Sequence, residues 1–306
     1  MEWFKIRRVS TFTRTPYAGN PAWVIVCPEG KVEENRMLRL TQELNPISDT
    51  TFVFPGDQSA DLYLRFFSKS EEINFSGHGT IAAYFGIAED NLIKLNEPIT
   101  LVRQHTKSGV QHLELRVKEN RVERVTVSIP IPQFLSMAID IKSISKILGV
   151  SPIDIQGTNY PVATVSSGIT DLIIPVKSLE QLMDIQPNFQ LMANYCNRLL
   201  ISGIVVYSMK TFDENNTVHM RHFAPTVGIK EDPVSGASSA SLGCYLLKNR
   251  IIPQEEMSRI LVEQGHSMNM PGIVYVHINI IKNQVLKVSF GGQGVVTFEG
   301  SIMCPE

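Results

Sequence analysis

Cysteine is scarce in this chain, and no cysteine lies in a paired motif. The 306 residues include four cysteines, with no Cys-x-x-Cys spacing among them. Disulfides are therefore not expected, and we predict thiols that are buried and pack as small hydrophobic side chains. They are Cys27, Cys196, Cys244 and Cys304.

Long apolar runs and a strong charge excess are also missing. No apolar run reaches the length of a transmembrane helix, and residues 1–5 lack a signal-peptide pattern. Lysine and arginine number 28 against 30 aspartates and glutamates, for a net charge of −2. This balance gives no reason to expect nucleic acid or a membrane as a partner. We therefore expect a cytoplasmic protein.

The glycine motifs that bind nucleotides are absent as well. No predicted strand is followed by G-x-G-x-x-G, and there is no G-x-x-x-x-G-K-[ST]. The sequence therefore supports neither a Rossmann site nor a P-loop. Apolar residues make up 43% and charged residues 19%, which is ordinary for a soluble globular protein. The length suits two domains, each with a core of its own.

What the chain does contain is one pattern that occurs twice. Each copy has a strand, a polar connection, a Ser-Gly turn and a helix of small residues. Such a duplication predicts two similar lobes. The matching segments are 65–67, 72 and 76–84 in the first copy, and 221–223, 231–232 and 235–241 in the second.

Alternating segments separate the copies. Residues 110–117 and 121–129 alternate in polarity and predict a hairpin, and the two prolines in 129–132 mark a linker. Residues 141–148 predict a helix that ends at Gly149. Further short strands are expected near the C-terminus. Many short strands around two helices of small residues predict an α+β protein.

The two Ser-Gly turns are candidate anion sites. The unpaired amides at a helix start attract anions, and Gly77 and Gly79 let a ligand approach the backbone closely. The alternative is that Ser76 is an ordinary N-cap. A second turn in the matching place, at Ser235 and Gly236, favours a shared cleft that binds a small anionic molecule.

Three side chains are candidates for proton transfer. His78 lies between two glycines at the predicted helix start, where an acid/base group is useful. Asp232 precedes the second turn and is expected to face His78, or else only to complement the helix dipole. Asp49 is either a turn former or an acid/base. The other histidines are expected to be structural: His105, His112, His219, His222, His266 and His277.

Taken together, these segments resemble the phenazine-biosynthesis PhzF-like family, within the diaminopimelate epimerase-like fold. The resemblance spans nearly the whole chain, with its motifs in the expected order. The matching pieces are Phe12 with Ala18-Gly19-Asn20-Pro21-Ala22, Gln42-Glu43-Leu44-Asn45, Ser48-Asp49-Thr50-Thr51-Phe52, residues 72–80, 221–225, 228–236 and 263–265, and finally Gly291-Gly292 with Glu299-Gly300.

The resemblance implies two pseudo-symmetric lobes, each a barrel-like sheet wrapped around a central helix, with the active site between them. It places residues 1–129 with 294–306 in one lobe and 130–293 in the other. It also implies a homodimer and a cofactor-independent isomerase, without a metal, that shifts a proton between carbons of a small carboxylate-bearing substrate.

Site residues follow from the resemblance position by position. His78 and Asp232 match the family's acid/base pattern, whereas Asp49 stands where a glutamate is expected. The shorter side chain would end about 1.5 Å short, and a misplacement of that size can cost on the order of 100-fold in rate. Ala237 replaces a usual serine, and Ser238 is the candidate to supply the missing hydroxyl. The implied substrate-binding residues are Asn20, Ser76, Gly77, Gly79, Ser235, Gly236, Ala237 and Ser238.

The related racemases use two opposed cysteines at the two turns. Here those positions are Ser76 and Ser235, and a serine hydroxyl is too weakly acidic to replace a thiol that must ionise. We therefore expect an acid/base isomerase rather than a two-thiol racemase. The departures at Asp49 and Ala237 leave a non-catalytic binding or interaction protein as the alternative. A lyase or hydratase that uses the same cleft is a further one.

Overall fold

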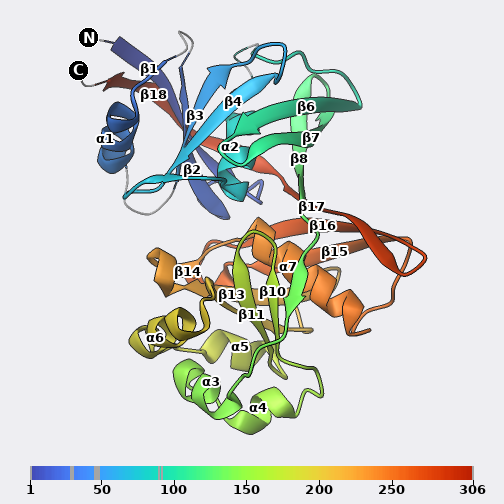
Figure 1. The fold of residues 1–306 in the computed structure, drawn as a ribbon. Coiled ribbons are helices and arrows are strands. Elements are labelled where there is room, and N and C mark those ends of the chain that lie inside the picture. Colours follow the sequence, from blue (N-terminus) through green and yellow to red (C-terminus); the bar gives the residue numbers. More distant parts are fainter. Residues whose placement is uncertain (1, 28–30, 45–48, 89, 91, 305–306) are drawn as a thin grey trace. The chain divides into compact units, whose positions relative to one another are not determined.

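The computed structural model describes residues 2–27, 31–44, 49–88, 90 and 92–304. The chain forms two compact units (Figure 1). Unit 1 comprises Met1–Ser128 and Gly291–Glu306, and unit 2 comprises Ile129–Phe290. Among the described residues, no helix has both the length and the apolar character needed to cross a bilayer.

Unit 1 is a mixed sheet with two helices. The last strand, β18, pairs antiparallel with the first, β1, so both ends of the chain belong to this unit (Figure 1). Its strands are β1 (Glu2–Thr11), β2 (Asn20–Val26), β3 (Thr50–Pro55), β4 (Leu62–Phe67), β5 (Glu72–Ile73), β6 (Ile99–Thr106), β7 (Gly109–Lys118), β8 (Arg121–Ile129) and β18 (Gly294–Cys304). Its helices are α1 (Glu34–Leu44) and α2 (Gly77–Gly86).

The strands of unit 2 also pair in both parallel and antiparallel fashion, and this unit has more helices. Its strands are β9 (Gln133–Leu135), β10 (Ala163–Ser166), β11 (Thr170–Pro175), β12 (Gly203–Ser208), β13 (Val218–Ala224), β14 (Ile229–Asp232), β15 (Met257–Gln264), β16 (Gly272–Ile281) and β17 (Gln284–Gly292). Its helices are α3 (Ile141–Leu148), α4 (Pro152–Gln156), α5 (Leu179–Asp184), α6 (Phe189–Leu199), α7 (Gly236–Lys248) and the short 3₁₀ helices η1 (Pro225–Val227) and η2 (His266–Met268).

The two units share one order of strand pairing. In unit 1, β2–β3 is parallel, β3–β4 antiparallel, β4–β6 parallel and β6–β7 antiparallel. In unit 2, β11–β12, β12–β13, β13–β15 and β15–β16 repeat this series. The short strands β5 and β14 each lead into a Ser-Gly turn and a helix. The repeat seen in the sequence is thus a repeat of topology.

Each unit surrounds one helix with strands. Helix α2 packs against β1, β2, β3 and β18, and α7 packs against β10, β11 and β16 (Figure 1). Small residues on both helices allow this close contact on several sides, and nearly all of their side chains are buried. Because the helices are enclosed, the position of each N-terminus is set by the sheet around it.

Several local predictions are confirmed. Strands β7 and β8 form the predicted antiparallel hairpin. Helix α3 spans Ile141–Leu148 and ends at Gly149, which adopts the left-handed conformation with φ 73°. All four cysteines are buried and free.

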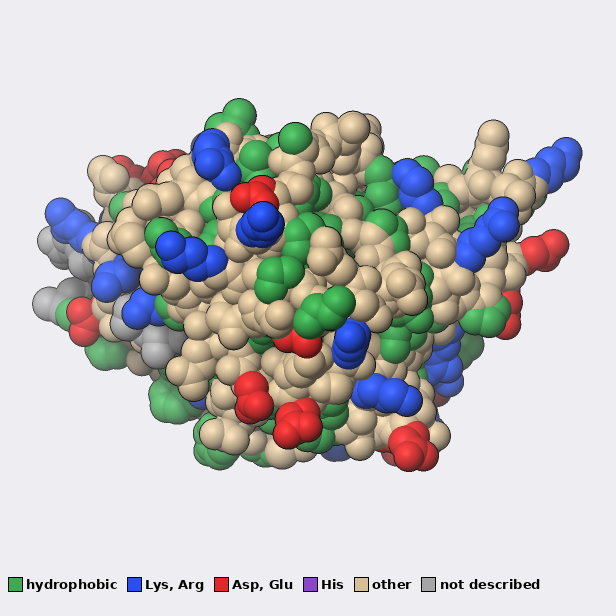
Figure 2. Space-filling model, turned by 90° about the horizontal axis from the view of Figure 1, so that it is seen from below, with side chains coloured by type: hydrophobic (Ala, Val, Ile, Leu, Met, Phe, Trp, Pro, Cys, Tyr) green, Lys and Arg blue, Asp and Glu red, His purple; other side chains and the backbone are tan. Residues whose placement is uncertain are grey.

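On the face drawn in Figure 2, basic, acidic and hydrophobic side chains are interspersed, in keeping with the balanced charge.

Replacing Gly236 by alanine is expected to lower the free energy of unfolding by roughly 1–3 kcal/mol. A Cβ there would lie 2.9 Å from Cζ of Phe290 and closer still to two other ring carbons. Phe290 is fully buried, so its ring has no room to turn away. Denaturant unfolding measures the loss. In the double variant with Phe290→Leu the clash is relieved. The stability lost by the double variant should therefore be smaller than the sum of the losses of the two single variants. A loss equal to that sum would contradict the explanation.

Candidate functional site

Unit 1 gathers three predicted site residues at the N-terminus of α2. Ser76 caps the helix, because its Oγ accepts a hydrogen bond from the Gly79 amide at 3.1 Å. The same hydroxyl donates to Oδ2 of Asp49 at 2.7 Å and lies 3.3 Å from Nδ1 of His78. Nε2 of His78 is 3.6 Å from Oδ2 of Asp49, which is within ion-pair distance. Asp49 and His78 therefore form one polar group around Ser76.

This group is partly buried, and one nitrogen of His78 makes no hydrogen bond to any described residue. The side chains of Asp49 and His78 are each 18% exposed, and Nε2 of His78 is buried with no hydrogen-bond partner among the described residues. A nitrogen of this kind is suited to give or take a proton when a substrate arrives. The geometry places the carboxylate of Asp49 next to the imidazole.

The amides of the first turn of α2 differ in their hydrogen-bond acceptors. The Gly79 amide donates to the Ser76 hydroxyl and so takes part in the helix cap. Gly77 and His78 are the first two residues of α2, and amides there have no intrahelical acceptor. Glycine is nevertheless required at position 79, because a Cβ would lie 2.7 Å from Oγ1 of Thr51.

Asn20 is the first residue of β2 and is 5% exposed. It lies opposite Thr11 in the β1–β2 pair, and the Thr11 hydroxyl donates to the Asn20 carbonyl at 2.7 Å. Its backbone position is therefore held firmly by the sheet. Asn45 and Ser48, which belong to the family pattern, lie outside the described residues.

Unit 2 has a second polar group at the N-terminus of α7. Oδ2 of Asp171 accepts a 2.7 Å hydrogen bond from Ser238, and Oδ1 lies 3.2 Å from Nε2 of His222. The opposite nitrogen of His222, Nδ1, is 3.7 Å from Oδ2 of Asp232. Asp171, at the start of β11, is fully buried, and the His222 side chain is only 5% exposed. The imidazole thus lies between two carboxylates.

Two of these residues are not identified as site residues by the sequence. The sequence predicts only a structural role for His222, and it does not single out Asp171. Parallel pairing of β11 with β12 and antiparallel pairing of β12 with β13 bring them together. The one available signal is an aspartate inside an otherwise apolar strand, since a buried carboxylate needs a partner.

Gln264, at the end of β15, holds the segment between Asp232 and the helix. Its Nε2 donates to the Asp232 carbonyl at 2.6 Å, and its Oε1 accepts from the Ser235 amide at 2.9 Å. Gln264 is 1% exposed, so both bonds are shielded from water. The backbone at Asp232 is therefore fixed relative to the start of α7.

Ser235 and Ser238 have different parts in this arrangement. Ser235 is the N-cap of α7, and its hydroxyl donates to Oγ of Ser238 at 3.0 Å. Ser238 is fully buried and its hydroxyl is committed to Asp171. That Ser238 supplies the hydroxyl missing at Ala237 stays a prediction, and in this structure the hydroxyl is bonded to Asp171. Gly236 and Ala237 are the first residues of α7, where the amides lack intrahelical acceptors.

The charge on His222 follows from its neighbours. Burial alone would lower the pKa of His222, but the charge of Asp171, the hydrogen bond to Asp171 and the nearby Asp232 outweigh burial and raise this pKa to about 10. The imidazole therefore keeps its proton at neutral pH. A protonated His222 places a positive charge beside the Asp232 carboxylate.

The free energy of unfolding should consequently fall as pH rises from about 6.5 to about 10. In this window the folded chain retains a proton on His222 that the unfolded chain has released. The contribution is complete below pH 6.5 and amounts to a few kcal/mol at most, because each tenfold difference in proton affinity is worth about 1.4 kcal/mol. Denaturant unfolding across this range measures it. His222→Gln should show a shallower fall than the wild type, and parallel profiles would contradict the assignment.

Comparison with known proteins finds relatives that match nearly the whole chain. The family described as phenazine biosynthesis-like protein matches residues 9–300. A curated relative, an uncharacterized isomerase of Clostridium acetobutylicum, is 29% identical over 304 residues, which is 98% of each chain. Both findings agree with the resemblance found in the sequence.

Solved structures confirm the predicted fold. A Bacillus anthracis phenazine biosynthesis protein of the PhzF family has a TM-score of 0.89 at 25% identity, over 99% of this chain and 100% of that one. A hydroxyproline epimerase from Agrobacterium vitis, solved with bound trans-4-hydroxy-L-proline, has a TM-score of 0.66 over 99% of this chain and 91% of its own. At 12% identity, the second likeness concerns the fold alone.

Proposed function

This chain belongs to the phenazine biosynthesis-like protein family, and we propose that it is an isomerase that shifts a proton between carbons of a small carboxylate-bearing metabolite. The isomerase class is supported by the relative from Clostridium acetobutylicum, which carries that name. One observation carries the proposed chemistry: each unit has a carboxylate and an imidazole at the N-terminus of its enclosed helix.

The proposed reaction needs a base, an acid and a site for negative charge. Asp232 and His78 form the proton-handling pair, and Asp49 acts as the second acid/base. One member of the pair removes a proton from a carbon next to an activating group. A protonated member of the pair then gives a proton to another carbon. The electron pair left by the first proton moves through the conjugated system, so no external oxidant or reductant takes part.

The helix N-termini would bind the anionic parts of the substrate. The amides of Gly77 and His78 on α2, and of Gly236 and Ala237 on α7, lack intrahelical acceptors and are suited to a carboxylate or to enolate-like charge. Such donors need no reorganisation during the reaction, because the surrounding sheets hold both helices in place. In the proposed site, carboxylates thus transfer the proton while backbone amides donate hydrogen bonds to the anion.

The direct test is solvent deuterium exchange into a panel of cyclic and amino-acid carboxylates. We expect time-dependent incorporation at carbon for at least one panel member that binds. A ligand that binds without any exchange would favour the non-catalytic alternative, which the departures at Asp49 and Ala237 motivate. A product that has lost a group, or has lost or gained water, relative to the substrate would indicate a lyase or hydratase.

Asp49→Asn is expected to lower the exchange rate on the order of 100-fold or more, since the amide cannot accept the proton. The amide oxygen can still accept the Ser76 hydrogen bond, so the fold around α2 should be kept. Asp49→Glu should retain exchange, because the family pattern has a glutamate at this position. An unchanged rate in Asp49→Asn would remove the acid/base role from Asp49.

A further inference from the structure

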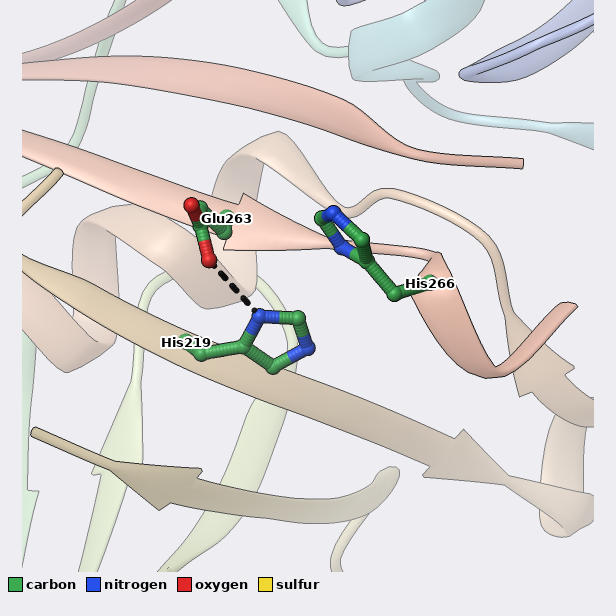
Figure 3. A group of neighbouring side chains, drawn as sticks. All are labelled: His219, Glu263 and His266. Atoms are coloured by element: carbon green, nitrogen blue, oxygen red, sulfur yellow. Dashed lines mark hydrogen bonds and ion pairs between the residues drawn. The ribbon is translucent and has the colours of Figure 1, made fainter. Parts of the chain in front are cut away.

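Strand pairing in unit 2 brings together three side chains that no proposed step uses. His219 on β13 lies directly opposite Glu263 on β15 in a parallel pair. Just beyond β15 the chain turns at Gly265, and His266 begins the short helix η2. The two imidazoles and the carboxylate therefore face one small volume (Figure 3).

The distances within this His219–Glu263–His266 group are close to those of a metal site. Nδ1 of His219 lies 3.0 Å from Oε2 of Glu263. One ligand atom from each of the three residues lies within 4.8 Å of the others. Ligand atoms around tetrahedral zinc are about 3.3 Å apart, as follows from bonds of about 2.0–2.1 Å. His266 is only partly buried, and its ring would have to move to close the remaining gap.

The group also contains polar atoms that the protein leaves unused. Nε2 of His219 and Nδ1 of His266 are buried and have no hydrogen-bond partner among the described residues. The side chains of His219 and Glu263 are 0% and 2% exposed. Buried polar atoms in folded proteins are nearly always bonded, so the free Nδ1 of His266 indicates a missing partner. The nitrogen of His219 that faces Glu263 is Nδ1, so a metal ion at this group would take the place of the His219–Glu263 hydrogen bond.

The surroundings hold Glu263 in position before any ligand binds. The Glu263 carboxylate also accepts hydrogen bonds from the amides of Phe212 and Asp213 and from Nδ2 of Asn216. The ring of Phe212 stacks on His266 with a centroid distance of 4.2 Å. A ligand site needs such support, because loose side chains would lose their freedom on binding.

We propose that His219, Glu263 and His266 form a binding site for one divalent transition-metal ion, zinc in the first instance. Two imidazoles and one carboxylate are a donor set typical of zinc, whereas calcium and magnesium prefer oxygen ligands alone. The sequence predicts no metal. The sheet register joins His219 on β13 to Glu263 on β15, and the turn at Gly265 brings His266 on η2 to them.

The role of this metal would be structural. Glu263 is followed by Gln264, whose side chain fixes the Asp232 carbonyl and the Ser235 amide, so an ion at Glu263 would tie η2 to the segment that starts α7. The proposal does not depend on the isomerase proposal, because the ion takes part in no proton transfer. Metal binding and isomerase activity can therefore fail separately.

The test uses the full chain after dialysis against a chelator, titrated with Zn²⁺ and with Co²⁺. We expect one equivalent of Zn²⁺ to bind and to raise the melting temperature, and Co²⁺ to give visible absorption bands of a low-symmetry site. His266→Ala should weaken Zn²⁺ binding at least 30-fold and abolish the rise in melting temperature. His112→Ala, at an exposed position on β7, is the matched control and should bind as the wild type does.

Two results would overturn the proposal. One is no Zn²⁺ binding by the wild-type chain at micromolar concentration. The other is equal binding by the wild type and His266→Ala, which would place the ion elsewhere. Glu263→Gln would remove a buried charge, and this variant can fail to fold. The test therefore uses a substitution at His266, which is only partly buried.

Discussion

Asp232→Asn is expected to lower the rate of deuterium exchange on the order of 100- to 10,000-fold, the range that a positioned acid/base group contributes. The amide cannot hold the transferred proton, although it is nearly the same size as the carboxylate. Gln264 binds the backbone of Asp232 rather than its side chain, so the start of α7 should stay in place. Exchange rates at saturating substrate, together with the unfolding curve, measure the effect.

The control for this variant is Asp184→Asn, which makes the same change at an exposed position on α5. It should exchange at the wild-type rate. If Asp232→Asn folds normally and exchanges as fast as Asp184→Asn, then Asp232 is not the proton-handling group. A further expectation is that substrate binding weakens less than turnover, because the amides, not Asp232, are proposed to bind the carboxylate.

Asp171→Ala is expected to lower the free energy of unfolding by roughly 3–5 kcal/mol, the usual cost of breaking a buried pair by removing one partner. Asp171 is fully buried and contacts both His222 and Ser238. Without it, His222 must give up its proton or carry a charge that only Asp232 offsets, and the Ser238 hydroxyl loses its acceptor. Denaturant unfolding at pH 7 measures the loss.

Asp171→Asn separates the charge from the shape of the side chain. The amide oxygen can still accept from Ser238, so this variant should lose less stability than Asp171→Ala. It should also flatten the fall in stability between about pH 6.5 and 10, because the pKa of His222 is raised chiefly by the charge of Asp171. A loss below about 0.5 kcal/mol in Asp171→Ala, the range of ordinary surface changes, would contradict the buried-pair description.

Local chemistry made much of the fold predictable. Ser76 and Ser235 cap helices where the Ser-Gly turns predicted them, and the hairpin of β7 and β8 follows from alternating polarity. The duplicated order of elements and the family motifs identified the family and fold confirmed by comparison. These features rest on neighbouring residues, so their signals are present in short stretches of sequence.

The sequence by itself thus determined the family, the fold class and the helix starts near which Asp49, His78 and Asp232 lie. Only the tertiary structure decided that His222 lies between Asp171 and Asp232, that Ser238 turns inward, and that His219 meets Glu263 and His266. The reason is that strand pairing joins residues about 45 to 50 positions apart, and a shift of the register by one residue would turn each side chain to the opposite face of the sheet.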